Sequence, residues 1–246
     1  MTFVTHWGDD DVRRVRHVAP PAGDLAPLTP ARASAEQWIY VAGGSAQAPG
    51  GEAIREGSVY LHRPFDAPPV FAAGPDGLEI VLLGPRRPPR AFDEPHLGPR
   101  LCHVEDCERY EDRHGDVDLT EHMIGDRLGS EHSGLGLIRL APDRRGYPLH
   151  VHSAEDERFV VLGGSGVARL DDAEHPVARG SVVDAPAKGP AHAFRAGPDG
   201  LVYLAWGERE PGDADYLPES GKVMLRGLRT IFRPQQLGYW DGEPGR

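Results

Sequence analysis

The stretch GYPLHVHSAEDERFVVLGG, residues 146–164, decides the fold of this chain. His150 and His152 are separated by one residue, and side chains alternate between the two faces of a β-strand. Both imidazoles are therefore expected on one face. Glu157 follows a short acidic turn and begins the next predicted strand. The segment predicts two neighbouring strands that direct two histidines and one carboxylate into a common interior.

A third histidine completes the set. His192 lies 35 residues after Glu157, beyond GSVVDAPAKGPA (180–191), which predicts a strand and a Pro/Gly turn. Three imidazoles and one carboxylate suit Zn, Fe, Mn, Ni or Cu and do not suit Ca or Mg. A mononuclear site of this kind keeps one or two positions open for water or substrate. The sequence predicts one divalent transition metal bound by His150, His152, Glu157 and His192.

The spacing of these residues resembles the two motifs of the cupin superfamily. The first, G(X)5HXH(X)3,4E(X)6G, is matched from His150 to Gly164, although Gly146 precedes His150 by three residues instead of five. The second, G(X)5PXG(X)2H(X)3N, is matched by Gly180, Pro186 and His192. In that motif Gly189 is one position late, and Ala196 replaces the asparagine. The resemblance implies an all-β chain of double-stranded β-helix, or jelly-roll, barrels.

Two alternatives to this ligand set remain open. Glu155 lies in the same acidic triplet as Glu157, and the six-residue gap to Gly164 favours Glu157. The chain has 12 histidines, so any one of them alone is more often an ordinary polar side chain.

An internal repeat indicates that the chain holds two such barrels in tandem. Residues 71–78 read FAAGPDGL and residues 194–201 read FRAGPDGL, with seven of eight positions identical. Two upstream blocks match at offsets of 121 to 123: EQWIYVAGG (36–44) with ERFVVLGG (157–164), and EGSVYLHRP (56–64) with RGSVVDAP (179–186). The predicted domains are an N-terminal cupin-like barrel, 1–95, and a C-terminal barrel with the metal site and tail, 96–246.

The first copy lacks the predicted ligands. This alignment places Thr29 and Ala31 opposite His150 and His152, and Pro69 opposite His192. Glu36 is left opposite Glu157, and a lone carboxylate does not hold a transition metal. The first barrel is expected to have a structural role, to form a dimer contact or to hold a ligand pocket without metal. Because the copy is short at its N-terminal side, we also expect it to borrow strands from elsewhere in the chain.

Local patterns predict how the remaining segments fold. The tetrapeptide GPDG at 74–77 and 197–200 predicts turns between short strands. Residues 84–133 are polar and Pro/Arg-rich, and they predict a connector without regular structure. Gly221–Ile231 is the one segment with helical patterning, so a short C-terminal helix or tail is expected.

Composition excludes several classes of function. The net charge of −11 and the absence of a basic stripe argue against nucleic-acid binding. No apolar run approaches the roughly 20 residues of a membrane helix, and no signal-peptide core occurs, so a cytoplasmic protein is expected by default. Two cysteines, Cys102 and Cys107, make no disulfide framework. With His103, His114 and His122 they form a loose cluster whose spacing fits no zinc pattern known to us.

Two functions remain open at this stage. The first is a metal-dependent enzyme acting on a small organic molecule, and the resemblance implies oxygenase or isomerase chemistry. Glu155 or Tyr147 would then serve as an outer proton-transfer group. The second is a non-catalytic module that binds a small molecule or a structural metal. A homodimer is plausible in either case.

Overall fold

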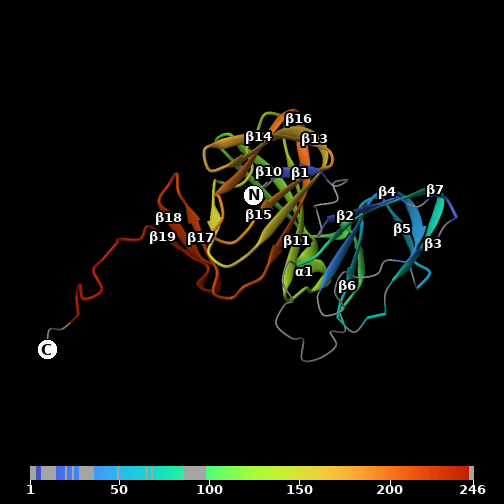
Figure 1. Ribbon diagram of the computed structural model, residues 1–246, viewed down its shortest axis with the longest axis horizontal. Helices are drawn as coiled ribbons and strands as arrows, with labels where there is room; N and C mark the ends of the chain where they lie inside the picture. Colours follow the sequence, from blue (N-terminus) through green and yellow to red (C-terminus); the bar gives the residue numbers. More distant parts are fainter. Residues whose placement is uncertain are drawn as a thin grey trace.

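The computed structural model describes residues 4–6, 15–19, 21–23, 25–27, 36–48, 50–64, 66–67, 69–85 and 98–243. Nearly all regular structure in these residues is β-strand, arranged in three antiparallel sheets (Figure 1). The observed chain is therefore all-β, as predicted. No helix in these ranges is long and apolar enough to cross a membrane.

The first sheet is built around strand β4 and comes almost entirely from the N-terminal part of the chain. Its strand order is β2-β7-β4-β6-β8, with β3 on β7 and β5 on β4. The strands are β2 (Val15–Val18), β3 (Leu25–Pro27), β4 (Gln37–Gln47), β5 (Ala53–Arg55), β6 (Ser58–His62), β7 (Val70–Leu83) and β8 (Leu101–His103).

The second sheet is built around β13 and runs in the order β1-β15-β13-β16-β11-β10-β9, with β14 on β13. Its strands are β1 (Val4–His6), β9 (Arg109–His114), β10 (Val117–Met123), β11 (Ser133–Leu140), β13 (Glu157–Leu170), β14 (Ala173–Ala178), β15 (Ser181–Ala185) and β16 (His192–Glu208). The 3₁₀ turn η1 (Val104–Asp106) precedes β9, and helix α1 (Ile124–Leu128) joins β10 to β11.

A third, small sheet lies at the C-terminal end. Its order is β12-β17-β18-β19, with bounds β12 (Val151–His152), β17 (Ala214–Leu217), β18 (Lys222–Leu225) and β19 (Thr230–Phe232). The helix predicted over Gly221–Ile231 is wrong. That segment forms β18, the 3₁₀ turn η2 (Arg226–Leu228) and the start of β19. Pairing with β17 through four residues overrides the weak helical pattern.

The connector prediction for residues 84–133 is also wrong where the structure describes it. From residue 98 onward this segment contains β8, η1, β9, β10 and α1. Polar residues are frequent in β9 because it is the outermost strand of its sheet and largely exposed. The predicted boundary near residue 95 lies outside the described residues, and the division into 1–95 and 96–246 stays a prediction.

The two larger sheets share a pairing scheme. Strand β4 pairs with β6 and β7, and β13 pairs with β15 and β16. Both ladders slip at matching places: between Val41 and Gly43 and again before Ala46 in β4, and between Val161 and Gly163 and again before Gly166 in β13. At the second slip the four GPDG residues, 74–77 in β7 and 197–200 in β16, pair with no residue of β4 or β13, and Gly77 and Gly200 have positive φ. The tetrapeptides therefore fold as bulges within one long strand each, and not as the predicted turns between separate short strands.

The register corrects one detail of the sequence alignment. Gln37 pairs with His62 in the first sheet just as Glu157 pairs with Ala185 in the second. Gln37, and not Glu36, therefore stands at the position of Glu157. The Glu36 carboxylate instead accepts hydrogen bonds from the backbone N–H groups of residues 131–133 and from the Ser133 hydroxyl, at 3.0–3.3 Å. Thr29 and Ala31 lie outside the described residues.

Each of the two sheets receives a strand from the other part of the chain. The N-terminal strand β1 pairs with β15, and β8 pairs with β6 of the first sheet. The two registers correspond, since His6 lies opposite Ser181 and His103 lies opposite Ser58. This exchange ties both ends of the N-terminal part to the C-terminal part.

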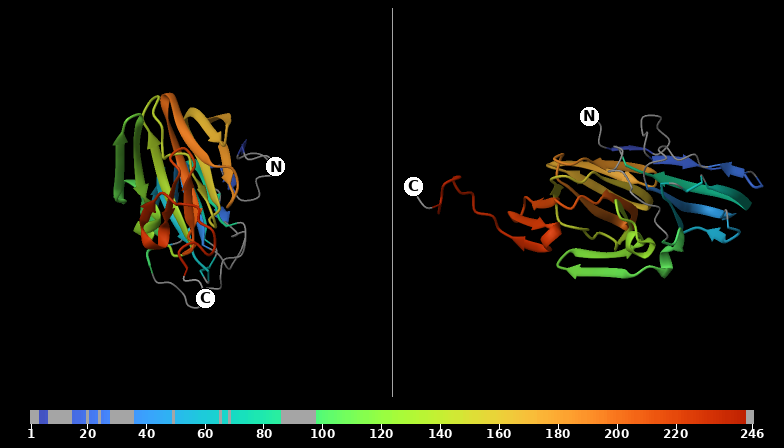
Figure 2. Two further views of the ribbon diagram at one scale, coloured as in Figure 1. Left: turned by 90° about the vertical axis from the view of Figure 1, so that its left-hand side faces the viewer. Right: turned by 90° about the horizontal axis from the view of Figure 1, so that it is seen from below.

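The largest hydrophobic cluster joins the two sheets face to face. Alternate residues of β4, Trp38, Tyr40 and Ala42, pack in one cluster with Val160 and Leu204 of the second sheet. The intervening residues of each sheet fill separate interiors, one centred on Ile39 and Ile80 and the other on Phe159 and Tyr203. A strand whose two faces are both buried shows no apolar–polar alternation. The right-hand view of Figure 2 shows the N-terminal strands, blue to teal, lying next to the yellow and orange strands of the second sheet.

The bulge glycines give a testable prediction. A Cβ atom on Gly164 would lie 2.1 Å from the carbonyl oxygen of Gly200, and its φ of +71° is left-handed; a Cβ on Gly163 would meet nothing within 4 Å. We expect Gly164→Ala to lower the free energy of unfolding by about 2 kcal/mol or more. The matched control Gly163→Ala should change it by less than about 1 kcal/mol. Urea denaturation measures both, and equal losses would contradict the assignment.

Candidate metal centre

Three strand ends position the four predicted ligands. His152 ends the two-residue strand β12, Glu157 begins β13 and His192 begins β16. His150 forms an isolated bridge with His192: the His192 N–H donates to the His150 carbonyl at 2.8 Å, and the reverse bond is 3.2 Å. Residues from separate parts of the sequence are thus fixed at one end of the second sheet.

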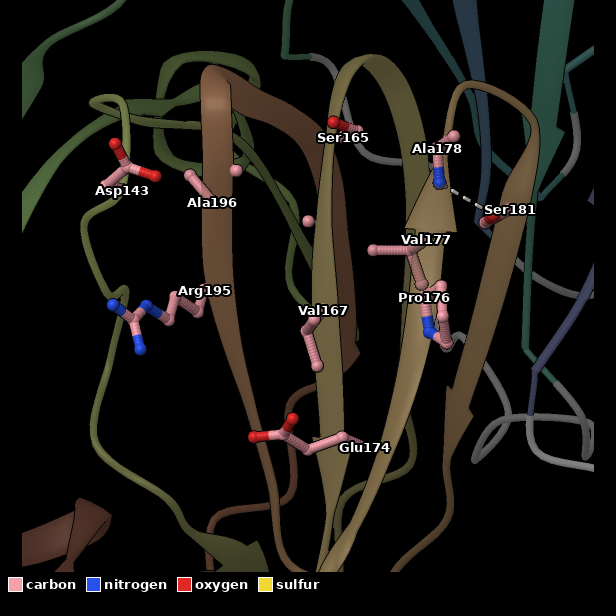
Figure 3. A pocket seen from close by; sticks show the side chains of 12 residues that line it. Asp143, Ser165, Val167, Glu174, Pro176, Val177, Ala178, Ser181, Arg195 and Ala196 are labelled. Carbon is pink, nitrogen blue, oxygen red and sulfur yellow. Dashed lines mark hydrogen bonds between the residues drawn. The ribbon is translucent and has the colours of Figure 1, made fainter.

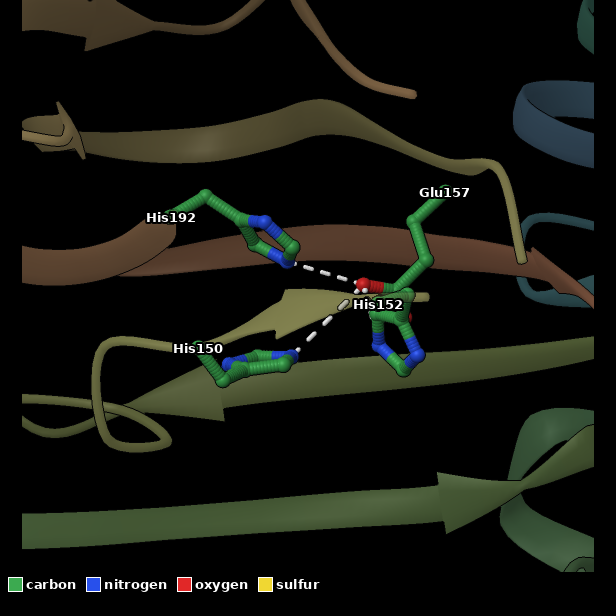
Figure 4. A group of neighbouring side chains, drawn as sticks. All are labelled: His150, His152, Glu157 and His192. Carbon is green, nitrogen blue, oxygen red and sulfur yellow. Dashed lines mark hydrogen bonds and ion pairs between the residues drawn. The ribbon is translucent and has the colours of Figure 1, made fainter. Parts of the chain in front are cut away.

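The three imidazoles converge on one carboxylate oxygen of Glu157. Glu157 Oε2 lies 2.8 Å from His192 Nε2, 3.1 Å from His152 Nε2 and 3.6 Å from His150 Nε2 (Figure 4). One donor atom from each of the four residues lies within 4.8 Å of all the others. Four donors this close, three nitrogen and one oxygen, form a group able to hold a metal ion.

The outer ring nitrogens set the tautomers of two histidines. His150 Nδ1 lies 2.8 Å from the Pro148 carbonyl oxygen, and His152 Nδ1 lies 2.6 Å from Asp213 Oδ2. Because a carbonyl and a carboxylate only accept, we assign the hydrogen to Nδ1 in both rings. Each Nε2 then faces the site. His152 Nε2 is buried and lies 3.1 Å from Glu157 Oε2.

Burial and pairing shift the pKa values of these groups in opposite directions. Burial raises the pKa of Glu157, but hydrogen bonds from the three imidazoles outweigh burial and hold that pKa well below its usual range. Burial lowers the pKa of His152, yet its bonds to Asp215 and Glu157 raise the net value to about 11. Burial also lowers the pKa of His192, and Glu157 only partly offsets that effect. Without a metal ion, His152 therefore carries the proton that neutralises Glu157.

Asp213 is a residue beside the candidate site that the sequence analysis missed. It is 2% exposed and comes from the loop before β17, outside both motifs. One carboxylate oxygen accepts from His152, and the other accepts from the backbone N–H of Ala154 at 2.7 Å and the Ser153 hydroxyl at 3.1 Å. Asp213 thus orients the imidazole and holds the turn between β12 and β13. The only sequence signal is an acidic residue after a Pro-Gly pair, which is common in loops.

A second group of donors, His152 with Asp213 and Asp215, also lies within metal-binding distances. Arg226 on the C-terminal side already supplies a cation there, with its Nε 3.1 Å from Asp215 Oδ1 and 3.8 Å from Asp213 Oδ2. We therefore interpret these carboxylates as support for His152.

Glu155 lies behind the site and not within it. Its Oε2 is 3.8 Å from His152 Nδ1, on the ring edge opposite the converging Nε2 atoms, and its Oε1 accepts from the Glu210 N–H at 2.8 Å. Burial raises the pKa of Glu155 to about 7. Of the two carboxylates left open by the sequence, Glu157 is the one that the structure places among the three Nε2 atoms.

A carboxylate and a cluster of aromatic rings lie on the same interior wall. The Tyr147 hydroxyl donates to Glu121 Oε2 at 2.5 Å, and burial raises the pKa of Glu121. The Phe159 ring lies 5.2 Å from the His192 ring and 4.8 Å from the Phe194 ring, between centroids, and Phe194 stacks with Tyr203. Burial raises the pKa of Tyr203, and the negative charges of Glu121 and Glu157 raise it further. Sequence analysis named Tyr147 but missed Glu121, whose segment it predicted to be a connector.

The Cys/His cluster does not assemble a site in the described residues. His103 and His122 each bond a backbone carbonyl oxygen, of Glu56 and Val104 respectively. The thiols of Cys102 and Cys107 lie 3.9 Å apart in the core between the sheets.

An open pocket of about 700 Å³ lies on β13, β14 and β16 (Figure 3), and none of the four predicted ligands lines it. Its polar lining includes Asp143, Glu174 and Arg195, and its edge is fixed by the Ser181 hydroxyl, which accepts from the Ala178 N–H at 3.1 Å. It contains no histidine or cysteine, so it offers no comparable donor set.

Comparison with known proteins identifies the fold. Oxalate decarboxylase from Bacillus subtilis superposes with a TM-score of 0.62 at 13% identity, covering 87% of this chain and 74% of that chain. Protein Ylba from E. coli gives 0.60 at 18% identity, covering 79% and 76%. The chain has the cupin fold.

A sugar phosphate isomerase of the cupin superfamily from Silicibacter pomeroyi is 23% identical over 58% of this chain and 94% of its own, with a TM-score of 0.48. No family model and no curated protein matches the sequence. At these identities the comparisons establish the cupin fold alone, and the chemistry must be argued from the side chains.

Asp213 can be tested as the group that orients His152. We expect Asp213→Asn to lower the affinity for Mn²⁺ by about 10–100-fold, because outer partners of metal-bound histidines contribute on that scale. The control Asp172→Asn, at a fully exposed carboxylate, should leave the affinity unchanged. Titration calorimetry measures both, and circular dichroism checks the fold. An unaltered affinity in Asp213→Asn would refute the role.

The pKa of His152 predicts that the stability of the metal-free fold falls as pH rises, whereas the stabilisation added by a bound metal ion grows. A raised pKa stabilises the metal-free fold fully below about pH 6.5, and this stability is lost as pH rises toward 11. The lowered pKa of Glu157 gives stability that is lost below about pH 4.5. A metal ion must displace the His152 proton, so its stabilising effect grows with pH. Melting temperatures with and without Mn²⁺ at about pH 6 and pH 8.5 should show a larger metal-induced increase at the higher pH. A pH-independent increase would contradict this.

Proposed function

We propose that this chain is a two-barrel cupin that binds one divalent transition metal and acts on a small organic molecule by metal-assisted chemistry of the oxygenase or isomerase type. The observation that supports the proposal is the convergence of three imidazole Nε2 atoms on one buried carboxylate oxygen. Such a set is costly to assemble without a cation, because one carboxylate and one proton cannot satisfy three rings.

In this proposal His150, His152, Glu157 and His192 hold the metal, and Zn, Fe, Mn and Ni all accept such donors. When bound, the ion would act as a Lewis acid on a substrate oxygen, or would bind O₂ if it is iron. Four protein donors leave one or two positions for water and substrate. The Mn(II) centres of the structurally similar oxalate decarboxylase make Mn²⁺ a suitable first probe.

The wall beside the ligands supplies the remaining functions. Glu121, with its pKa raised by burial, is held by the Tyr147 hydroxyl and is suited to exchange a proton with a bound substrate. Phe159, Phe194 and Tyr203 present apolar faces that exclude water and orient a small ligand. Glu155, also considered for proton transfer, lies behind His152 and supports that ligand instead.

The first barrel, proposed as residues 1–95, serves as a scaffold. Gln37 occupies the position of Glu157 in the shared strand register, and extending that register by three residues beyond Ala72 places Pro69 at the position of His192. Neither residue is a transition-metal ligand. The shared bulges and the exchanged strands β1 and β8 support the two-barrel description.

Mn²⁺ loading of the full chain tests the proposal. We expect one Mn²⁺ per chain by elemental analysis, and an inner-sphere water seen as enhanced water-proton relaxation, because a catalytic metal keeps an open position. His150→Ala should remove most of the bound metal, whereas His114→Ala, at an exposed histidine in β9, should not. A loaded protein without relaxation enhancement would contradict the enzyme and favour a structural or binding role. Equal loading of all three proteins would refute the ligand set.

A further inference from the structure

The chain has two cysteines, and the fold brings their thiols together. Cys102 lies in β8 and Cys107 follows the 3₁₀ turn η1, with their sulfur atoms 3.9 Å apart and no disulfide between them. A disulfide bond is about 2.05 Å long, so the sulfurs need to approach each other by roughly 2 Å. Side-chain rotation and a small shift of η1 supply such a movement, so each thiol has the other as its nearest bonding partner.

The surroundings of the two thiols give them different reactivity. The hydrogen bond from Cys102 lowers the pKa of Cys107 and outweighs the opposing effect of burial, and the Arg127 charge lowers it further. The same hydrogen bond, and then burial, raise the pKa of Cys102. In its neutral form the Cys107 thiol donates to the His103 carbonyl oxygen at 3.5 Å. Because the thiolate is the reactive form of cysteine, Cys107 is the nucleophile of the pair.

Access to the thiols limits the size of the oxidant. Cys102 is 8% and Cys107 6% exposed, and both belong to the apolar cluster between the two sheets. The neighbours of Cys107 in the sequence, Asp106 and Glu108, are exposed. A small molecule therefore reaches Cys107 beside this turn, whereas a protein thiol or a bulky disulfide does not.

The segment between the cysteines lies where the chain passes from the first sheet to the second. The N–H of Val104 donates to the Gly57 carbonyl oxygen at 3.0 Å, and the Val104 carbonyl oxygen accepts from His122 Nδ1 at 2.8 Å. Cys102 itself pairs with Val59 of β6. A disulfide would thus close a ring around a residue that is bonded to both parts of the chain.

We propose that Cys102 and Cys107 form a redox-sensitive pair that a small hydroperoxide oxidises reversibly to a disulfide. The Cys107 sulfur attacks the peroxide, the O–O bond breaks, and Cys107 becomes a sulfenic acid while the other oxygen leaves as an alcohol or water with the thiol proton. The Cys102 sulfur then attacks the Cys107 sulfur, the S–O bond breaks, and the hydroxyl leaves as water with the Cys102 proton. The two sulfurs together lose the two electrons that the peroxide gains.

Peptide mapping of the full chain tests the proposal. Trypsin cuts after Arg100 and Arg109, so both cysteines fall in one peptide, residues 101–109, which contains no methionine. After treatment with a small molar excess of hydrogen peroxide, we expect this peptide to be lighter by two hydrogen atoms. Dithiothreitol should restore both thiols, and circular dichroism checks that the chain stays folded throughout.

Two serine variants separate the proposed reaction from general oxidation. In Cys102→Ser the reaction should stop at the Cys107 sulfenic acid, which dimedone traps on the same peptide. In Cys107→Ser the Cys102 thiol should react at least about tenfold more slowly than in the full chain, because a buried thiol without an activating partner is inert.

Three outcomes would overturn the proposal. They are a folded chain that keeps both thiols after peroxide treatment, a disulfide that links two chains, and a Cys102 thiol that reacts as fast in Cys107→Ser as in the full chain. The inference does not depend on the proposed metal chemistry, because neither cysteine is among the proposed ligands.

Discussion

The position of the Glu157 carboxylate, 15% exposed among three imidazoles, constrains the C-terminal half of this molecule. Its Oε2 atom has three imidazole nitrogens within 3.6 Å, and an isolated carboxylate in such a place would be expelled or protonated. The three rings can meet there only if the ends of β12, β13 and β16 are held in one register. The backbone bonds between His150 and His192 fix part of that register, and the long ladder between β13 and β16 fixes the rest.

The C-terminal segment is coupled to the same constraint. Asp213 and Asp215 approach His152 from the side opposite Glu157, and Arg226 neutralises both carboxylates. His152 therefore lies between two acidic groups, which is why its pKa rises despite burial.

The all-β class and the four donor residues could be predicted because both depend on the spacing of residues along the sequence. Alternation on a strand places His150 and His152 on one face whatever the rest of the chain does. Elements whose structure depends on partners far away in the sequence could not be predicted from local spacing. The segment from β8 to β10 is polar, and only its pairing with β6 and β11 makes it a set of strands. Asp213 and Glu121 reach the site through tertiary contacts that no spacing rule encodes. The GPDG segments are strong turn signals, yet they fold as bulges because flanking ladders continue past them.

The same strand positions carry different chemistry in the two sheets. Where the second sheet has Glu157, the first has Gln37, and the same register extended beyond β7 places Pro69 opposite His192. Neither Gln37 nor Pro69 can hold a transition metal. Next to Gln37, the Glu36 carboxylate accepts four hydrogen bonds from residues 131–133 at the start of β11. Trp38 adds a bond from its indole N–H to the Ser133 hydroxyl at 2.9 Å, and its ring fills the cluster between the sheets. Ser133 pairs with Glu208, the neighbour of Gly207, and Gly207 pairs with Glu157, so these contacts brace the part of the second sheet that presents Glu157. The start of β4 corresponds to the start of β13, which presents Glu157 in the second sheet. In the first sheet this strand end presents no ligand and instead anchors the two sheets to each other.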